Sequence, residues 1–477
     1  MEDRAQLNRS LGPAHVWALA VGAIIGWGCF ILPGNYLSWS GPLGALLGMV
    51  VGAVLMMFIA KAYGFLMGRY PVSGGAFAFS YVGFGRDHAF ICGWFLVLTY
   101  LSIVPLNATA LPIPVNFFLG NVLHVGYLYT LAGWDVHLAE IALACTTLVV
   151  FGYLNIRGVR FAGGSQLWMV VLMVGSVALL ATGSLMDPQV SMKNLVPLFA
   201  PGKSAWVSIL LVLALTPWAY MGFDTIPQAA EEIGFPPEKA KRLMFASILM
   251  GCVMYCVVIL STALASPWEA QVYPKVPVWA TGTSIQASMG GFGVVVLMVG
   301  VVMGILTGIN GFYLATSRLL FCMGRARILP PWFGEIHPKY KTPRNAVLFI
   351  MWVSFLAPWF GREAILWIVN MSALGMALGY AYTSFAAARL SRGTEEHRHR
   401  WIFYVGGVFS ISVVAVLTLP NSPASLEMPS WIALGAWTLL GAIFYLGQAR
   451  EFRRIPKAEL DRLILDLEAS EAAPSTV

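Results

Sequence analysis

Residues 22–30 read GAIIGWGCF and residues 216–224 read TPWAYMGFD, and each stretch lies within a long apolar run. Three glycines fall within seven residues of the first stretch, and each costs about 1 kcal/mol relative to alanine inside a helix. In the second run, Pro217 and Pro227 each remove a backbone donor and clash with the preceding turn. We therefore expect both runs to form helices that are interrupted near their centres.

The composition places these runs in a membrane. Of the 477 residues, 58% are hydrophobic and only 11% are charged, and the mean hydropathy is +0.74. A soluble protein carries about 25% charged residues, so this chain has too few charges to cover several soluble domains. The same numbers exclude a disordered chain, a disulfide scaffold and a soluble enzyme. The sequence predicts a polytopic membrane protein.

Apolar runs bounded by charges, prolines and glycines predict twelve membrane-spanning helices in an all-α fold. The residues outside them, 1–13 at the start and 450–477 at the end, are expected to be cytoplasmic. The predicted spans are 14–37, 42–68, 86–112, 138–156, 163–186, 204–229, 243–266, 290–318, 344–360, 364–388, 401–419 and 430–449.

The lysines and arginines predict the orientation. With both termini in the cytoplasm, 25 of the 29 basic residues lie on the inner side, and the other four are Lys193, Lys203, Lys275 and Arg362. Basic residues accumulate in cytoplasmic loops, so we expect a multi-pass protein of the cell membrane with both termini inside. The same bias explains the net charge of +7 without a nucleic-acid partner.

The interrupted spans are the first and the sixth, which open two halves of five spans each. Interrupted helices at matching positions of two halves mark a substrate site between inverted repeats. Close helix packing through small residues is the alternative for the first span. Unwound backbone exposes amides that favour a carboxylate and carbonyls that favour an ammonium group, so the expected ligand is a small zwitterion shaped like an amino acid.

Four stretches form a pattern: GAIIGWGCF at 22–30, YPVSGGAF at 70–77, AYMGFD and AEEI at 219–224 and 230–233, and the segment 318–343 with GR at 324–325, LP at 329–330 and KTP at 341–343. In this order they resemble the amino acid–polyamine–organocation transporter superfamily, over about residues 10–450. The resemblance implies an amino acid permease with a five-plus-five inverted repeat of the leucine-transporter type. The first repeat would cover residues 14–186, the second 204–390, and two extra helices 401–449.

Carried over by position, the resemblance implies a substrate site. The amides of Trp27 and Gly28 would hold the carboxylate, and the carbonyls of Ile24, Trp218 and Met221 would hold the ammonium group. Trp218 and Phe312 would form walls, and Ile103 or Asn107 would face the pocket. The full expected set is Ile24, Ile25, Gly26, Trp27, Gly28, Ile103, Asn107, Trp218, Ala219, Tyr220, Met221, Gly222 and Phe312.

Two positions depart from the family pattern. Trp27 stands where the family usually has a small residue, so its ring would either shrink the pocket or point into the protein. Some members carry a lysine in the fifth helix in place of a sodium ion, but the aligned residue here is Met173, and no residue of 161–186 ionises. A lysine-based mechanism is therefore not expected.

Asp224 is the clearest carboxylate within a span, and such residues are functional candidates by default. We expect it to couple proton movement to transport; the alternative is a structural acceptor that caps amides of the unwound segment. Glu231 and Glu232 are expected to pair with Lys239, Lys241 or Arg242 near the inner end. Beyond residue 450, the tail could form a basic amphipathic helix on the membrane surface or a solvated extension.

The sequence thus predicts a secondary active transporter that moves an amino acid by alternating access. Its partners would be that substrate, the lipid bilayer and a coupling ion, with a proton preferred over sodium. An amine or polyamine permease, or a substrate exchanger, is the alternative within this fold. No enzyme activity, cofactor or metal site is expected, because catalytic sets are absent and the histidines at 15, 88, 124, 137 and 337 show no ligand spacing.

Overall fold

The computed structural model describes residues 7, 9–131, 133–186, 190–272, 279–420, 422 and 425–467. Within these residues, eight helices are long and apolar enough to cross a membrane. Shorter apolar helices lie at 13–25, 205–219 and 344–360. The fold is that of a helical polytopic membrane protein. The count of twelve spans and the inverted repeat remain predictions, and Lys275 of the orientation argument lies outside the described residues.

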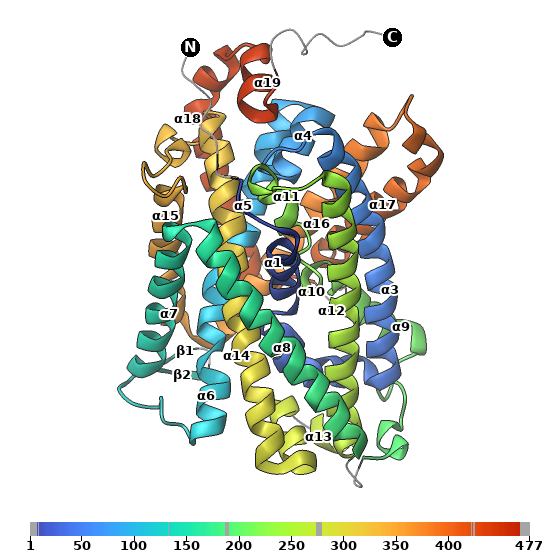
Figure 1. The fold of residues 1–477 in the computed structure, drawn as a ribbon. Coiled ribbons are helices and arrows are strands. Elements are labelled where there is room, and N and C mark those ends of the chain that lie inside the picture. The colour runs from blue at the N-terminus through green and yellow to red at the C-terminus, as the bar shows by residue number, and fades with distance from the viewer. Residues whose placement is uncertain are drawn as a thin grey trace.

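The first half of the chain runs from the first broken helix to a long helix that ends at Met186 (Figure 1). Its helices are α1 (Pro13–Ile25), α2 (Gly28–Ile31), α3 (Pro33–Arg69), α4 (Ala76–Phe84), α5 (Arg86–Ala110), α6 (Pro112–Leu119), α7 (Leu138–Arg157) and α8 (Val159–Met186).

The second half begins with a 3-10 turn at Met192–Leu195 and a helix in three pieces, α9 (Ala205–Leu213), α10 (Thr216–Ala219) and α11 (Thr225–Gln228). Further 3-10 turns lie at Ala230–Glu232, Pro331–Gly334, Ala357–Phe360 and Glu395–His399. The remaining helices are α12 (Pro237–Ala265), α13 (Trp268–Val272), α14 (Ala280–Arg325), α15 (Arg344–Ser354), α16 (Gly361–Leu390), α17 (Arg400–Thr418), α18 (Met428–Arg454) and α19 (Lys457–Leu465).

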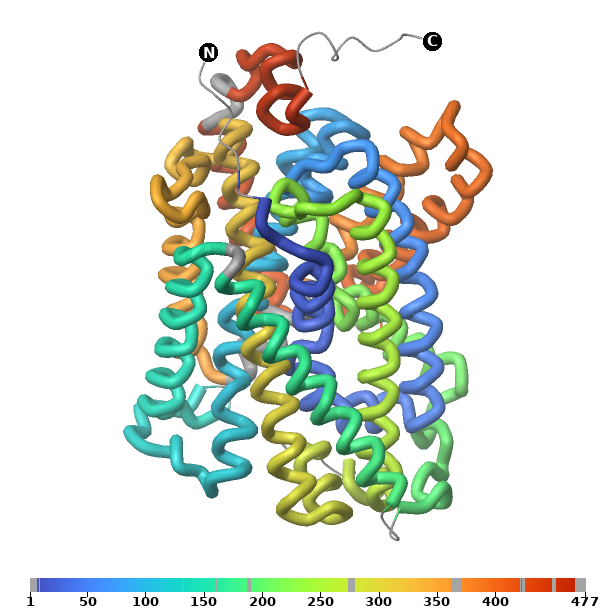
Figure 2. The backbone as a smooth tube through the Cα atoms, in the orientation of Figure 1, coloured from blue at the N-terminus to red at the C-terminus, as the bar shows by residue number. Residues whose placement is uncertain are grey.

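Both predicted interruptions are present. Helix α1 ends at Ile25, Gly26 adopts φ +38°, and α2 resumes at Gly28. The second interruption separates α10 from α11, with Gly222 at φ +139° between them. The pieces α1, α10 and α11 lie together in the middle of the molecule, among α5, α8, α12 and α14 (Figures 1 and 2).

Two long helices contain kinks at glycines. In α3, Gly41 adopts φ +70° directly before Pro42, which divides the helix between the first two predicted spans. A Cβ on Gly41 would lie 2.6 Å from the Phe199 backbone, so only glycine allows this close approach. In α14, Gly290 adopts φ +60° at the position where the predicted span begins.

A β-hairpin was not predicted from the sequence. Strands β1 (Tyr127–Leu131) and β2 (Trp134–His137) pair antiparallel between α6 and α7. The segment lies at the end of the molecule opposite α19 (Figure 1). The two strands have only five and four residues, which is too short for an alternating pattern to be recognised in so apolar a chain.

The helix α19 packs on the protein rather than extending freely from it. Leu460 and Ile464 are buried, and the Tyr81 hydroxyl donates to Asp461 Oδ1 at 2.8 Å. Arg86 donates at 2.8 Å to the carbonyl of Phe452, which lies near the end of α18, just before α19. The predicted amphipathic helix therefore buries its apolar side against this end of the helix bundle, and residues 468–477 of the expected solvated tail lie outside the described part of the chain.

Candidate functional site

A small cavity of about 20 Å³ lies where the two broken helices meet. Every residue of the expected substrate-binding set lines it except Tyr220 and Gly222. Two residues that sequence reasoning missed, Ala23 and Tyr255, complete the wall. The lining residues are Ala23, Ile24, Ile25, Gly26, Trp27, Gly28, Ile103, Asn107, Trp218, Ala219, Met221, Tyr255 and Phe312.

Gly222 and Tyr220 hold the broken helices in place from behind the cavity. A Cβ on Gly222 would lie 2.5 Å from the Ile24 nitrogen and 2.7 Å from the Ala23 carbonyl carbon. The backbones of the two interruptions therefore touch directly at Gly222. The Tyr220 hydroxyl donates to the Met49 carbonyl at 3.0 Å, which anchors the second interruption to α3.

Two buried polar atoms in the cavity wall have no hydrogen-bond partner among the described residues. They are Asn107 Oδ1, an acceptor, and Trp218 Nε1, a donor. The Asn107 amide nitrogen donates to the Ile103 carbonyl at 3.0 Å, so only its oxygen is left over. Because buried polar groups are nearly always paired, an unpaired donor and acceptor at one cavity suit a polar ligand.

Aromatic rings close the cavity. Trp27 is 4% exposed, and its ring meets Trp218 edge-on, with centroids 5.8 Å apart. Phe312 contacts Tyr100, with ring centroids 5.9 Å apart. Trp27 lines the cavity, and its ring packs against the ring of Trp218, which lines the same cavity.

Tyr255 reaches the cavity from α12. Its hydroxyl donates to the Ile24 carbonyl at 3.5 Å, the carbonyl that the resemblance assigns to an ammonium group. Nothing in the local sequence marks this tyrosine, since it lies in a continuous apolar span. Only the packing of α12 against α1 brings it to the site.

Asp224 is fully buried, and its contacts match the structural-cap alternative. Its Oδ1 accepts a hydrogen bond from the Gly222 amide at 2.8 Å, and its Oδ2 accepts one from the Tyr100 hydroxyl. The acid thus stabilises the unwound segment from within. Its contacts continue through Tyr100, whose ring packs against Phe312 of the cavity wall.

A neutral amide joins the first broken helix to α8 and α14. Gln166 Nε2 donates to the Ala18 carbonyl at 3.3 Å and to the Thr307 carbonyl at 3.2 Å. Its Oε1 accepts from Asn310 at 2.8 Å. Met173, the residue aligned with the lysine of some family members, is buried in α8. The glutamine side chain that joins these three helices is uncharged.

The expected pairing of Glu231 and Glu232 with Lys239, Lys241 or Arg242 is wrong. Glu232 forms a bidentate pair with Arg318 at 2.8 and 2.9 Å, and Glu231 forms one with Arg325 at 2.8 and 3.0 Å. These arginines lie far along the chain on α14, whereas the rejected partners were chosen for proximity in sequence. The pairs tie the end of the second broken helix to α14.

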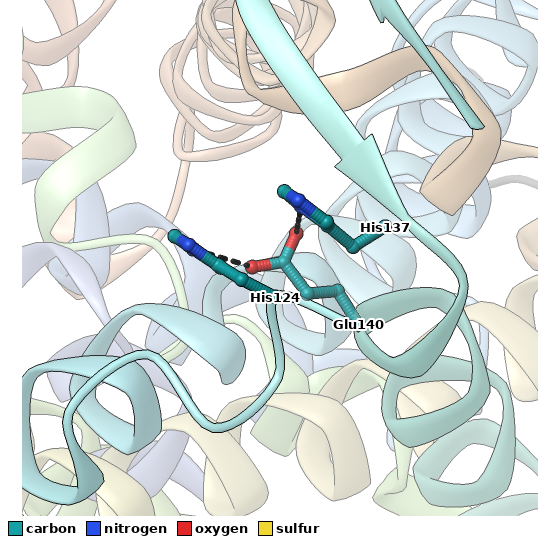
Figure 3. Close-up of side chains that lie close together, drawn as sticks. All are labelled: His124, His137 and Glu140. Carbon is teal, nitrogen blue, oxygen red and sulfur yellow. Dashed lines mark ion pairs between the residues drawn. The ribbon is translucent and has the colours of Figure 1, made fainter. Parts of the chain in front are cut away.

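The expectation that no histidine has a carboxylate at ligand spacing is also wrong. His124, His137 and Glu140 gather beside the β-hairpin, with their side chains close together (Figure 3). His124 Nε2 lies 3.7 Å from Glu140 Oε1, and His137 Nδ1 lies 3.9 Å from Glu140 Oε2.

Residues 11–443 match the model of a family described as amino acid permease. The chain is 25% identical to a branched-chain amino acid permease of Bacillus subtilis, over 94% of this chain and 95% of that protein. It is 24% identical to a methylthioribose transporter of Bacillus subtilis, with the same coverage. It is also 24% identical to a histidine permease of Lactococcus lactis, over 97% of this chain and 99% of that protein.

We predict that Gly222→Ala destabilises the protein far more than Gly158→Ala. Both glycines adopt similar positive φ angles, +139° and +130°, so both variants carry backbone strain of about 1–3 kcal/mol. Only at position 222 does the new Cβ meet backbone, which adds about 1–3 kcal/mol. The measurement is the midpoint of thermal unfolding of each purified variant, and equal midpoints would contradict the close approach.

Glu232→Gln should cost about 3–5 kcal/mol, because it leaves the buried Arg318 charge without a counter-charge. The matched control is Glu396→Gln, whose carboxylate pairs with Lys61 at 3.4 Å but is 29% exposed. An exposed pair contributes about 0–1 kcal/mol. Thermal unfolding compares the two variants, and an equal effect would mean that the Arg318 pair does not tie the second broken helix to α14 as described above.

Proposed function

The chain belongs to the amino acid permease family, a family of membrane transporters rather than enzymes, and we propose that it carries an amino acid by alternating access. The observation that carries this proposal is the pair of unpaired buried atoms, Asn107 Oδ1 and Trp218 Nε1, at the cavity between the broken helices. A buried donor and a buried acceptor at one cavity suit a ligand that carries both hydrogen-bond acceptors and donors.

The ends of the ligand would bind different backbone groups. The first amides of a helix have no acceptor within that helix, so the amides at Trp27 and Gly28 suit the substrate carboxylate. The carbonyls of Ile24, Trp218 and Met221 would receive the ammonium group, and Asn107 Oδ1 would add an acceptor. The indole nitrogen of Trp218 would donate to the carboxylate.

The size of the cavity supports a closed step of the transport cycle. A cavity of about 20 Å³ has space for little more than one water molecule, so an amino acid cannot enter without movement of the walls. Trp218 and Trp27 are the rings that would separate. The ion pairs of Glu231 with Arg325 and of Glu232 with Arg318 would then have to break for the substrate to leave toward the cytoplasm.

We place the end with α19 in the cytoplasm and the β-hairpin outside the cell. Twenty-five of the 29 lysines and arginines then lie on the inner side, as expected for a plasma-membrane protein. The hairpin and its histidines would face the external medium.

A proton is the proposed coupling ion, and Asp224 its carrier. The Tyr100 hydroxyl contacts this acid directly, and the Tyr100 ring contacts Phe312 of the cavity wall. Where α1, α8 and α14 meet, the neutral amide of Gln166 donates hydrogen bonds to the carbonyls of Ala18 and Thr307. These carbonyl oxygens therefore already have a partner, which supports a mechanism without a sodium ion at this place. Amine transport and substrate exchange remain the alternatives within the same fold.

Gly28→Leu should abolish substrate binding. A Cβ at this position would lie 2.8 Å from the Trp218 ring, so a leucine would fill the space between the broken helices. Gly175→Leu is the matched control, because a Cβ there meets no atom within 4 Å. Binding is measured with a radiolabelled amino acid found by thermal-shift screening.

The same binding assay tests the two ends of the ligand. Amines that lack the carboxylate should compete much less well than the parent amino acid, because they leave the Trp27 and Gly28 amides unpaired. Equal competition by the amines would favour the amine permease. Unchanged affinity in Gly28→Leu would mean that the substrate binds elsewhere.

Asp224→Asn should remove uptake driven by an imposed proton gradient and spare exchange of substrate for substrate. The asparagine oxygen can still accept from the Gly222 amide, and its NH2 group can donate to the Tyr100 oxygen, but the side chain cannot carry a proton. Asp87→Asn is the control, since Asp87 also accepts from a tyrosine, Tyr445 at 2.6 Å, but is exposed. Both activities are measured in the same liposomes.

Three results would oppose a coupling role for Asp224. Unchanged gradient-driven accumulation in Asp224→Asn would exclude it as the proton carrier. Loss of exchange together with loss of folded protein would favour the structural cap. A sodium requirement in the unaltered protein would contradict proton coupling itself.

A further inference from the structure

We propose that His124, His137 and Glu140 form a zinc-binding site at the hairpin end of the molecule, outside the substrate cavity. Two imidazoles and one carboxylate are a ligand set that zinc accepts, with water in the remaining position. Magnesium and calcium prefer sites made of oxygen alone, so this set selects a transition metal.

The three side chains come from different elements that the backbone holds together. His137 ends β2, Glu140 lies in the first turn of α7, and His124 follows α6. The Leu138 amide donates to the Gly126 carbonyl at 2.8 Å, which brings the loop carrying His124 against the start of α7. The imidazole rings of His124 and His137 stack with centroids 4.5 Å apart.

The distances leave room for an ion among the three side chains. One candidate ligand atom from each residue lies within 4.8 Å of the other two. The nitrogen–oxygen separations of 3.7 and 3.9 Å are too long for hydrogen bonds. Two ligand atoms that each lie about 2.0 Å from one tetrahedral zinc ion are about 3.3 Å apart. The imidazole and carboxylate groups would therefore have to move only slightly closer together to bind the ion.

His137 supplies the independent sign that a ligand is missing. This residue is only 8% exposed, and its Nδ1, which faces Glu140, has no hydrogen-bond partner among the described residues. A buried imidazole nitrogen left in this way costs free energy unless something binds it. A metal ion between His137 and Glu140 would satisfy it.

Asn116 orients the Glu140 carboxylate, as residues that hydrogen-bond to the ligands do at metal sites. Its Nδ2 donates to Glu140 Oε1 at 2.7 Å, and its Oδ1 accepts from the Leu123 amide at 3.0 Å. One asparagine therefore orients both Glu140 and the loop that carries His124. A cavity of about 480 Å³ adjoins the cluster and gives an ion a route to it.

The test is calorimetric titration of the untagged full-length protein with zinc chloride. We expect one zinc ion per chain, no saturable binding in His124→Asn or His137→Asn, and about 10- to 100-fold weaker binding in Asn116→Ala. Magnesium chloride should give no saturable binding. His399→Asn is the matched control, because His399 also pairs with a glutamate three residues away, Glu396 at 3.5 Å, and should bind zinc as the unaltered protein does.

Thermal unfolding gives a second readout that does not depend on transport. Zinc should raise the midpoint of the unaltered protein and of His399→Asn, but not that of His124→Asn. Because His124 is 44% exposed, its replacement should leave the fold intact even if His137→Asn fails to fold. Absence of saturable zinc binding to the unaltered protein, or equal binding in His124→Asn, would overturn the proposal.

Discussion

The direct backbone contact between Gly222 and the Ala23–Ile24 segment is the constraint on which the rest of the site depends. A side chain at position 222 would collide with backbone, not with a flexible group that could move away. The contact holds two interrupted helices side by side, so that their unpaired backbone groups border one cavity. Asp224 supports the same place from within by accepting the Gly222 amide.

The sequence was most informative where local chemistry forbids a regular helix. The glycines of 22–30 and the prolines of 216–227 predicted both interruptions, and the resemblance named almost all residues that line the cavity between them. Tyr220 and Gly222 were correctly placed in the interruption but support it from behind. Side-chain direction within an unwound segment depends on tertiary contacts that no spacing rule supplies.

What escaped sequence reasoning depends on residues far apart in the chain. Glu232 finds Arg318 across 86 positions, whereas the predicted partners were neighbours in sequence. Tyr255 reaches the cavity only because α12 packs on α1, and His124 meets His137 only because a hairpin folds back between them. Asp224 shows a different difficulty, since a buried acid can serve as a cap and as a proton carrier with the same contacts.

The most direct test of the account is a cryo-electron microscopy structure of the protein with a transported amino acid bound. We predict density for the ligand between Gly26–Gly28 and Trp218–Met221, with the carboxylate at the amides of the first break. The cavity, about 20 Å³ here, should be enlarged by movement of Trp218 or Trp27. Ligand density in the cavity of about 480 Å³ beside His124, His137 and Glu140, with the two breaks still in contact and no ligand between them, would contradict the account.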